Sequence, residues 1–392
     1  MAKSIKTYLK TAAKDYTYRS VNPPVVRAST ILFKTMQELR KHQKDIANQK
    51  DVDHWDYGRQ GTQTTIQLQK LLRGLEEAYQ VFLTPTGFSA VALAIMSICR
   101  PGDEIVFSDG VYRPTQKLAD DLLKEFNVKA VWYNPNNFEE LKNKITKKTK
   151  LIYVENPGSN TFEMQDLGKV VSLAKSKNIF TAIDNTWATA YFFKPLKLGF
   201  DIAITSATKY YSGHSDVMGG TVAVNKKVYK KVWWYNHMSG YRLSPDDAYL
   251  IIRGLRTLDI RMDKHQESTK KVINFLKTQR KIYKILYPYK TSSKEYKLWK
   301  KYYSGASGLV SVIIKSNNKN SVYKFVNALE LFGIGYSWGG FESLAVYTDP
   351  IELGNRRYFK LEKNEHLVRL HIGLEEPKDL INDLKSALKF VK

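Results

Sequence analysis

Cysteine is almost absent from this chain, which has one such residue, Cys99, among 392. A single cysteine excludes both an internal disulfide framework and a metal site built from several cysteines of one chain. Because Cys99 ends the apolar run "AVALAIMSIC", we expect a buried and unreactive thiol.

Long apolar runs are also absent, since no stretch approaches the ~20 consecutive apolar residues that a membrane helix requires. The first ten residues, "MAKSIKTYLK", are basic, and no apolar segment follows them as it would in a secretion signal. We therefore expect a cytoplasmic protein that has no membrane partner.

Several catalytic signatures are missing. The chain has no Walker phosphate loop, "TGFSA" departs from the G-x-S-x-G spacing of a hydrolase nucleophile, and the seven histidines form no H-E-x-x-H group. The segment "DVDHWD" is acidic, but no glycine-spaced calcium loop surrounds it. We expect no metal site.

Acidic residues are scarce relative to basic ones, because 38 Asp and Glu stand against 62 Lys and Arg and leave a net charge of +24. The excess is spread over segments such as "KNKITKKTK", whereas nucleic-acid-binding proteins usually concentrate it in one arm or stripe. We interpret it as a lysine-rich surface and expect no nucleic-acid partner.

Strand-like and helix-like segments alternate between residues 64 and 225. The strand-like segments are "EIVFSD", "AVWYN", "LIYVEN", "IFTAID", "IAITSA" and "GTVAVN". Apolar residues at helical spacing lie between them, as in "RPTQKLADDLLKEF" and "DLGKVVSLAKSKN". This order predicts an α/β protein with an open, mainly parallel sheet that helices cover.

The regions on either side of this alternation follow other patterns. Residues 1–60 lack it and resemble an arm that wraps around another body. Beyond the sheet we expect one long polar helix over residues 246–279, followed by the strand "GLVSVIIKS", the helix "NSVYKFVNALELF" and the strand "HLVRLHIGLE". The chain is thus predicted to consist of the arm, a large domain over 61–250 and a smaller α+β domain over 251–392.

Candidate ligand-binding groups occur where strands end, which is where open α/β sheets bind their ligands. Asp184 ends one strand, and Lys209 lies two residues beyond the next. Gly87 and Phe88 open an apolar helix whose first amides could point at a phosphate. A Thr-Gly helix start without any ligand is the plainer interpretation of this last feature.

Lys209 is flanked by two hydroxyl residues, Ser206 and Thr208, which could hold phosphate oxygens. A lysine that forms an imine with a phosphorylated cofactor needs a phosphate-binding site close to its amine. Asp184 could keep a pyridine nitrogen protonated, so that the ring accepts electrons from a carbanion. The alternatives are that Lys209 is a solvated surface lysine and that Asp184 caps the next helix.

Arg369 lies in "HLVRLHIGLE", where alternate residues share one face of a strand. We expect the face with Val368 and Leu370 to pack on the core and the face with Arg369 to be open. Arg369 then points either into water or into a cleft, where it could hold a carboxylate through two hydrogen bonds.

Nine segments, taken in order, resemble the Cys/Met metabolism family of enzymes that depend on pyridoxal 5'-phosphate (PLP). They are "YGRQGTQTT", "PTGFSAVA", "VYRPTQ", "VENPGS", "IDNTWA", "SATKYYSGHSDVMGG", "RGLRTLDIRM", "YSWGGFESL" and "LVRLHIGLE". The resemblance covers nearly the whole chain and is strongest to the bacterial cystathionine β-lyases. It implies the aminotransferase-like fold of PLP enzymes (fold type I), with a mainly parallel seven-stranded sheet in the large domain, and a homotetramer of two active dimers.

The resemblance also implies roles for the residues at matching positions. Lys209 is the imine-forming lysine, Asp184 is the partner of the pyridine nitrogen, and Tyr112 stacks on the ring. The implied phosphate ligands are the amides of Gly87 and Phe88, the hydroxyls of Ser206 and Thr208, and Tyr57 and Arg59 from the neighbouring subunit.

The substrate implied by the resemblance is an amino acid, whose α-carboxylate Arg369 binds with Ser337 nearby. The implied reaction is that of a carbon–sulfur β-lyase of methionine biosynthesis, which converts L-cystathionine to L-homocysteine, pyruvate and ammonia. Lys209 moves the α-proton, and Tyr57 and Tyr112 help in proton handling.

Trp338 favours the β-lyase reaction, because the related γ-synthases carry a smaller aliphatic residue at this position after Ser337. Two departures leave the substrate open: His237 stands about where β-lyases can have a tyrosine, and "TPTG" replaces a cysteine often found before that glycine. The alternatives are cystathionine γ-synthase or γ-lyase activity, cysteine desulfhydrase activity and alanine racemisation.

Overall fold

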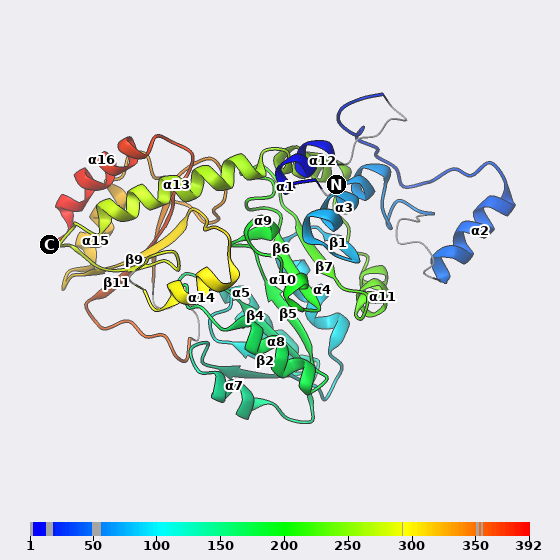
Figure 1. Ribbon diagram of the computed structural model, residues 1–392, viewed down its shortest axis with the longest axis horizontal. Coiled ribbons are helices and arrows are strands. Elements are labelled where there is room, and N and C mark those ends of the chain that lie inside the picture. The colour runs from blue at the N-terminus through cyan, green and yellow to red at the C-terminus, as the bar shows by residue number, and fades with distance from the viewer. Residues whose placement is uncertain (1–2, 13–18, 49–55, 292, 350–352, 354–355) are drawn as a thin grey trace.

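The computed structural model describes residues 3–12, 19–48, 56–291, 293–349, 353 and 356–392. Seven strands form the larger of its two sheets: β1 (Gln80–Thr84), β2 (Glu104–Ser108), β3 (Lys129–Tyr133), β4 (Thr149–Glu155), β5 (Phe180–Asp184), β6 (Ile202–Ser206) and β7 (Gly220–Val224). Their order in the sheet is β1-β7-β6-β5-β4-β2-β3 (Figure 1). The five strands from β6 to β3 pair in parallel, and β7 is antiparallel to both of its neighbours. The predicted mainly parallel sheet is confirmed.

Helices lie between and beyond these strands. They are α3 (Gln63–Glu76), α4 (Gly87–Ile98), α5 (Arg113–Lys117), the π-helix η2 (Leu118–Leu122), α6 (Leu123–Glu125), α7 (Phe138–Lys144), α8 (Leu167–Ser176), α9 (Thr189–Phe192), α10 (Pro195–Leu198), α11 (Tyr229–Ser239) and α12 (Pro245–Leu255). None of the helices in the described ranges is long and apolar enough to cross a membrane.

The large sheet is buried on both faces because alternate side chains enter two separate cores. In β2, Val106 joins a core that also contains residues of α3, α8 and α12. Its neighbours Ile105 and Phe107 join a second core with residues of α4 and α11. Cys99 belongs to this second core, and burial raises the pKa of its thiol to about 12, as expected for an unreactive cysteine.

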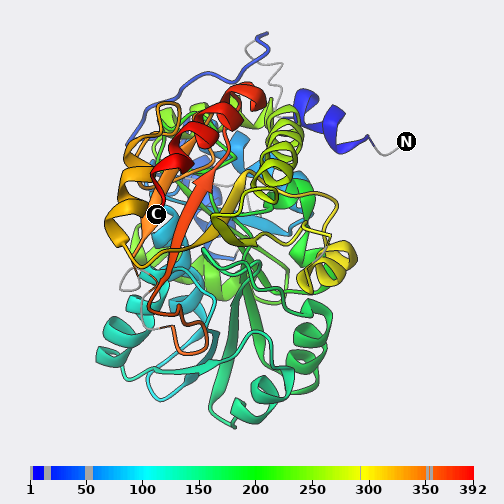
Figure 2. The ribbon, with the colours of Figure 1, turned by 90° about the vertical axis from the view of Figure 1, so that its left-hand side faces the viewer.

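The C-terminal part is built on a second, four-stranded antiparallel sheet. Its strands are β8 (Ile282–Leu286), β9 (Leu309–Lys315), β10 (Leu344–Thr348) and β11 (Glu365–His371), in the order β10-β11-β9-β8. Its helices are α13 (Leu258–Leu276), α14 (Glu295–Tyr302), α15 (Lys319–Asn327), α16 (Pro377–Ala387) and the 3₁₀ turn η3 (Leu388–Phe390). Figure 2 shows this part, in yellow to red, stacked on the cyan and green elements of the larger sheet.

The central strand β11 corrects one prediction. Val368 and Leu370 are buried as expected, but Leu367 and His371 on the opposite face are buried as well. Of that face, Arg369 in the middle of the strand and Glu365 at its start keep partial exposure. The second face is covered because the segment that follows α15 folds across it, with the His371 ring bonded to the Gly339 amide and the Glu342 carbonyl.

The single long helix predicted over residues 246–279 is also wrong, because the structure has α12 and α13 with a break at Arg256 and Thr257. At the break, the carbonyl of Gly254 accepts a hydrogen bond from the buried Arg261 guanidinium at 2.7 Å. Arg261 also binds the Tyr210 carbonyl at 2.8 Å, so the break brings α13 onto the segment that follows Lys209.

Two helices occur in the N-terminal region, where only an arm was expected: α1 (Ile5–Thr11) and α2 (Met36–Ala47). Helix α1 is fixed to α13 by ion pairs from Lys6 to Asp263 at 2.8 Å and from Lys10 to Asp259. Helix α2 buries no residue and stands apart from the body of the chain (Figure 1). The division of the chain near residues 60 and 250 stays a prediction.

Candidate active site

The candidate site lies at the carboxyl ends of adjacent strands of the large sheet. Asp184 ends β5 and pairs in register with Glu155, which ends β4. Lys209 lies three residues beyond the end of β6, in a turn where its amide binds the Ser206 carbonyl at 3.1 Å. The parallel order of β4, β5 and β6 therefore brings these three side chains to one edge of the sheet.

Lys209 reaches across to the C-terminal part of the chain. Its Nζ donates a hydrogen bond to Ser337 Oγ at 2.5 Å and lies 5.4 Å from the centroid of the Trp338 ring. Burial, supported by the nearby Arg369 guanidinium and opposed by the Asp184 carboxylate, lowers the pKa of the Lys209 amine to about 8. Lys209 is therefore no solvated surface lysine.

The segment that carries Ser337 packs directly on the backbone of Lys209. A Cβ on Gly339 would lie 3.0 Å from the Lys209 carbonyl carbon, and Gly339 has φ of +91°. Ser337 also has a positive φ, +85°, which is an uncommon conformation for a residue with a side chain. The His371 ring holds the segment by accepting the Gly339 N–H at 3.1 Å.

Arg369 points toward the same group of residues. Its Nη2 donates to the Ser337 carbonyl at 3.1 Å, so the guanidinium lies beside both Ser337 and the Lys209 amine. Of the two orientations expected for Arg369, the one into the site is found. A half-buried guanidinium next to a serine hydroxyl is suited to an amino-acid carboxylate.

Asp184 caps no helix, because the next helix begins only at Thr189. Its Oδ1 instead accepts the Thr186 N–H at 2.9 Å. Burial raises the pKa of the Asp184 carboxyl, while the bond from Thr186 and the charge of Lys209 oppose the rise. A protonated heterocyclic nitrogen would give this carboxyl the close cation that stabilises its charged form.

A phosphate could bind at the start of α4. Thr86 Oγ1 accepts the N–H of Ser89, and the two helical amides before Ser89, those of Gly87 and Phe88, have no acceptor within the helix. Ser206 belongs to the same corner, because a Cβ on Gly87 would lie only 2.4 Å from Ser206 Oγ. A phosphate here would lie beside Ser206, whose carbonyl accepts the Lys209 amide.

Thr208 fits less directly than the sequence implied. Its hydroxyl donates to the Gly219 carbonyl at 3.2 Å and accepts the Gly219 N–H at 3.0 Å. The hydroxyl would have to turn away from the Gly219 carbonyl before it could donate to a phosphate oxygen.

Tyr112 opens the α5 segment and is about half exposed. Its amide donates to Glu155 Oε2 at 2.7 Å. Partial burial and the carboxylates of Glu155 and Asp184 raise the pKa of the Tyr112 hydroxyl, which Arg369 opposes. The ring is therefore placed among the groups that surround Lys209.

Glu155 is a site residue that the sequence analysis missed. Burial and the neighbouring Asp184 carboxylate raise the pKa of Glu155 well above its usual range. The signal was available, since Glu155 ends the strand "LIYVEN" as Asp184 ends "IFTAID". His371 was also missed, because its partner Gly339 is 32 residues away in the chain.

Tyr57 and Arg59 are not brought to Lys209 within one chain. Arg59 donates to the His237 carbonyl at 3.1 Å, and both residues line a cavity of about 60 Å³ against α11. Tyr57 is 47% exposed. Their assignment to the site of a neighbouring subunit stays a prediction.

The residues present fit PLP. The site offers an amine whose pKa is lowered to about 8, a buried carboxyl whose pKa is raised, and helical amides beside a serine hydroxyl. These groups match the aldehyde, the ring nitrogen and the phosphate of the cofactor in turn. Lys209, Asp184, Gly87, Phe88 and Ser206 are the residues of this chain that would hold it.

Comparisons with known proteins point to the same chemistry. A family model described as "Cys/Met metabolism PLP-dependent enzyme" matches residues 6–389. The cystathionine beta-lyase of Bordetella avium is 35% identical over 369 residues, which are 94% of this chain and 92% of the relative. Cystathionine beta-lyase MetC of Escherichia coli is 34% identical over 388 residues, 97% of each chain. The L-alanine/L-glutamate racemase of Wolbachia pipientis is 34% identical over 375 residues, 94% of this chain and 92% of the relative.

Solved structures of similar proteins have the same fold. The metB protein of Corynebacterium glutamicum has a TM-score of 0.90 at 30% identity and covers 99% of this chain and 98% of its own. Cystathionine gamma synthase of Xanthomonas oryzae has a TM-score of 0.90 at 27% identity, and the match covers 100% of this chain and 99% of the synthase chain. Since the family model and the relatives extend over nearly all of its length, the chain belongs to the Cys/Met metabolism family of PLP-dependent enzymes.

Proposed function

We propose that this enzyme is a carbon–sulfur β-lyase that converts L-cystathionine and water to L-homocysteine, pyruvate and ammonia. The observation that carries the proposal is the placement of Trp338 against Lys209, beside the Ser337 and Arg369 pair. A bulky ring next to the reacting amine is the feature that distinguishes this site from the γ-synthases, which carry a smaller aliphatic residue at that position.

Substrate orientation depends on Arg369 and Ser337 in this proposal. Arg369 binds the α-carboxylate of the amino acid through two parallel hydrogen bonds, and Ser337 Oγ adds a third. Because Ser337 Oγ also contacts Lys209 Nζ at 2.5 Å, a carboxylate held there has its α-carbon within reach of the amine. Asp184 lies at the end of β5.

When bound, PLP would supply an aldehyde able to form an imine with an amine and an electron-poor ring able to stabilise negative charge at the α-carbon. Lys209, when free, would remove the α-proton in its neutral form, and a pKa of about 8 leaves roughly one tenth of the amine neutral at pH 7. Asp184 keeps the ring nitrogen protonated through its charged form.

The leaving thiolate departs from the β-carbon while electrons move from the α-carbon to form a carbon–carbon double bond. Lys209, carrying the α-proton, or Tyr112 then protonates the thiolate, which yields homocysteine. The unsaturated three-carbon product hydrolyses with water to pyruvate and ammonia. The bond from the Tyr112 amide to Glu155 supports this role, because it holds the backbone of Tyr112 beside the site.

Racemisation of alanine is the second candidate function. The specific observation in its favour is the L-alanine/L-glutamate racemase that is 34% identical to this chain. Racemisation requires the same removal of the α-proton by Lys209, followed by return of a proton to the opposite face, for which Tyr112 is a candidate donor.

We also propose that the active unit contains at least two subunits. Arg59 and Tyr57 lie away from Lys209 in their own chain, while Tyr57, Trp234 and Met238 expose 47%, 50% and 65% of their surface. A second subunit that covers this face would bring its Tyr57 and Arg59 to the phosphate corner. Light scattering of the purified protein should give a dimer or a tetramer, and a monomer that is fully active would contradict this part of the proposal.

The test of the reaction is a steady-state comparison of four substrates: L-cystathionine, L-cystine, O-succinylhomoserine and L-alanine. We expect the highest kcat/KM with cystathionine and release of pyruvate and homocysteine in equal amounts. Lys209→Ala should abolish turnover, whereas Lys226→Ala, on an exposed position after β7, is the matched control and should retain it. Faster racemisation of alanine than pyruvate release from cystathionine would overturn the β-lyase proposal in favour of the second candidate.

A further inference from the structure

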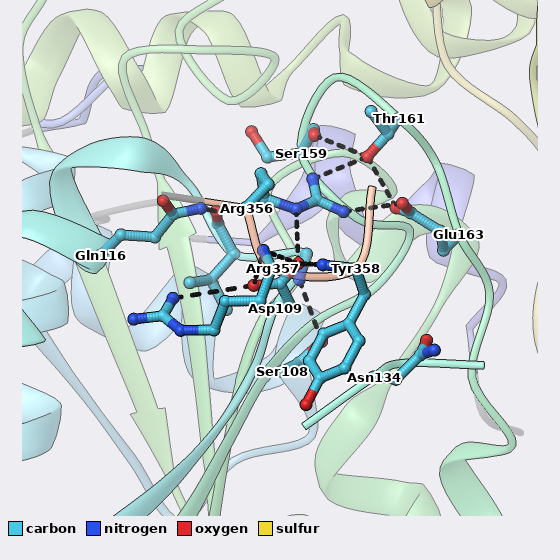
Figure 3. Close-up of polar contacts among 12 residues, drawn as sticks. Ser108, Asp109, Gln116, Asn134, Ser159, Thr161, Glu163, Arg356, Arg357 and Tyr358 are labelled. Atoms are coloured by element: carbon cyan, nitrogen blue, oxygen red, sulfur yellow. Dashed lines mark hydrogen bonds and ion pairs between the residues drawn. The ribbon is translucent and has the colours of Figure 1, made fainter. Parts of the chain in front are cut away.

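A buried arginine joins the C-terminal part of the chain to the loop that carries Tyr112. Arg356 belongs to the connection between β10 and β11, yet its side chain lies among residues that follow β2 and β4 (Figure 3). Arg356 is 3% exposed at its side chain and Asp109, its partner, is fully buried. Nothing in the proposed reaction makes direct use of this pair.

Arg356 uses its whole guanidinium. Nε donates to Asp109 Oδ2 at 3.1 Å, Nη1 donates to Thr161 Oγ1 at 2.8 Å, and Nη2 donates to Glu163 Oε1 at 2.7 Å. Thr161 Oγ1 donates in turn to Glu163 Oε2 at 2.7 Å. A guanidinium that spans two loops in this way fixes the distance between them, because its donors are held in one plane.

Asp109, which follows β2, accepts several of the hydrogen bonds that the β10–β11 connection makes here. In addition to Arg356, it accepts the backbone N–H groups of Arg357 at 3.0 Å and Tyr358 at 3.1 Å. Arg357 stacks over Trp132 at 4.3 Å. Three consecutive residues of the β10–β11 connection are therefore seated on one buried carboxylate (Figure 3).

The same loop leads directly to Tyr112. Asp109 follows β2 and is separated from Tyr112 by two residues, of which Gly110 accepts the Ser159 N–H through its carbonyl at 2.7 Å. The Tyr112 amide then binds Glu155, whose pKa Arg356 lowers through its charge, against the stronger effect of burial. Arg356, Asp109, Thr161 and Glu163 therefore contact the start of the loop that carries Tyr112. The charge of Arg356 also acts on Glu155, the partner of the Tyr112 amide.

The loop that follows β4 is closely packed against this cluster. A Cβ on Gly158 would lie 2.5 Å from Glu163 Oε2, and a Cβ on Gly110 would lie 3.2 Å from the Gly158 Cα. The loops after β2 and β4 therefore have little room to move independently while Arg356 holds Glu163 and Asp109. Removing Arg356 would leave the buried Asp109 and the partly buried Glu163 without the cation that they share.

We propose that Arg356 is a positioning residue for Tyr112, which it holds through Asp109 and the loop between them. The proposal rests on the proposed function in one respect, the assignment of Tyr112 to the cofactor ring. It predicts that the position of the ring-stacking tyrosine depends on a residue of the β10–β11 connection, in the part of the chain that also supplies Ser337, Trp338 and Arg369.

The test compares cofactor-loaded Arg356→Gln and Arg356→Lys with the wild-type enzyme. We expect Arg356→Gln to lower kcat for cystathionine roughly 10- to 100-fold, as a displacement of about 1 Å does, and to leave KM within about threefold, because Arg369 and Ser337 still bind the carboxylate. Visible circular dichroism of the bound cofactor should change, since it reports the ring and its stacking partner. Arg356→Lys restores the charge and should recover part of kcat and of the spectrum.

The matched control is Lys301→Met. Lys301 also pairs the C-terminal part with the large domain, through Asp166 at 3.2 Å, but the hydrogen bonds of these two side chains go to each other, to Lys169 and to Tyr302 rather than to residues 109–112. The control should leave kcat and the visible spectrum unchanged. If Arg356→Gln fails to fold, the Arg356→Lys variant alone still separates the outcomes, because it keeps a cation between Asp109 and Glu163.

Two results would overturn the inference. One is a kcat within about twofold of wild type together with an unchanged visible spectrum in a folded Arg356 variant. The other is an equal loss of kcat in Lys301→Met, which would assign the effect to the general packing of the C-terminal part on the large sheet. If the wild type binds PLP but does not cleave cystathionine, the proposed function fails, while the spectra of the Arg356 variants still test the placement of Tyr112.

Discussion

The Lys209 amine should capture PLP near neutral pH, unlike an ordinary lysine. Its pKa is about 8, compared with 10.5 for an unperturbed side chain. At pH 7.5 a lysine with a pKa of 8 is roughly one quarter neutral, whereas one with a pKa of 10.5 is roughly one thousandth neutral. Because only the neutral amine attacks an aldehyde, the structure predicts a loading rate about 200-fold higher than that of an exposed lysine of equal reactivity.

Arg369→Gln tests how much of the lowered pKa of Lys209 comes from the charges that surround it. The Arg369 guanidinium disfavours the charged amine, so its removal should raise the pKa of Lys209 and move the midpoint of loading to higher pH. Asp184→Asn removes the opposing charge and should move the midpoint to lower pH. The two shifts have opposite signs although both variants lose a charge from one pocket.

The assay mixes cofactor-free enzyme with PLP and follows the absorbance of the bound cofactor between about pH 7 and pH 10.5. The neutral fraction rises with pH, so the wild-type rate should rise through a midpoint near pH 8 and then level off. A wild-type rate that still increases steeply above about pH 9.5 would refute the reasoning, since it would mean an unperturbed amine. So would shifts of the same sign in both variants.

Two further predictions concern the packing around the site. Burial raises the pKa of Glu76 to about 7 although Tyr211 donates to it, so the folded state holds a proton that the unfolded state loses above its pKa of 4.5. The stability that this proton contributes is complete below pH 4.5 and is lost as the pH rises through 7. Glu76→Gln should therefore raise the free energy of unfolding by up to about 3 kcal/mol at pH 8 and hardly change it at pH 4.5, as measured by urea unfolding. Equal effects at both pH values would contradict this. Gly87→Ala would place a Cβ 2.4 Å from Ser206 Oγ and should weaken PLP binding roughly tenfold by equilibrium titration, whereas Gly335→Ala, with open space around it, should not.

The sequence identified the parts of the site that follow from local rules. Asp184 and Lys209 could be found because a parallel strand directs whatever follows it to one edge of the sheet, and the strands themselves were evident from their apolar runs. Gly87 could be found because a helix start is recognisable within a few residues. The same rule applied to β4 would have found Glu155.

What the sequence could not predict depends on contacts between distant segments. Arg356 and Asp109 are 247 residues apart, and a lone arginine in a connection has no periodic signal. The open face expected for Arg369 is covered because the segment with Gly339 folds across it, which alternation along one strand cannot indicate. Strands β8 and β10 were missed since both are short edge strands, and β8 exposes Tyr283.

The central claim is that Lys209 is the residue that bonds the cofactor, and chemical trapping tests it most directly. The purified, PLP-loaded enzyme is yellow if the claim holds; it is reduced with borohydride, digested and analysed by mass spectrometry. The account predicts a phosphopyridoxyl group on the peptide that contains Lys209, and a colourless, unlabelled Lys209→Ala variant. A label on another lysine, or a wild type that stays colourless after incubation with PLP, would contradict it.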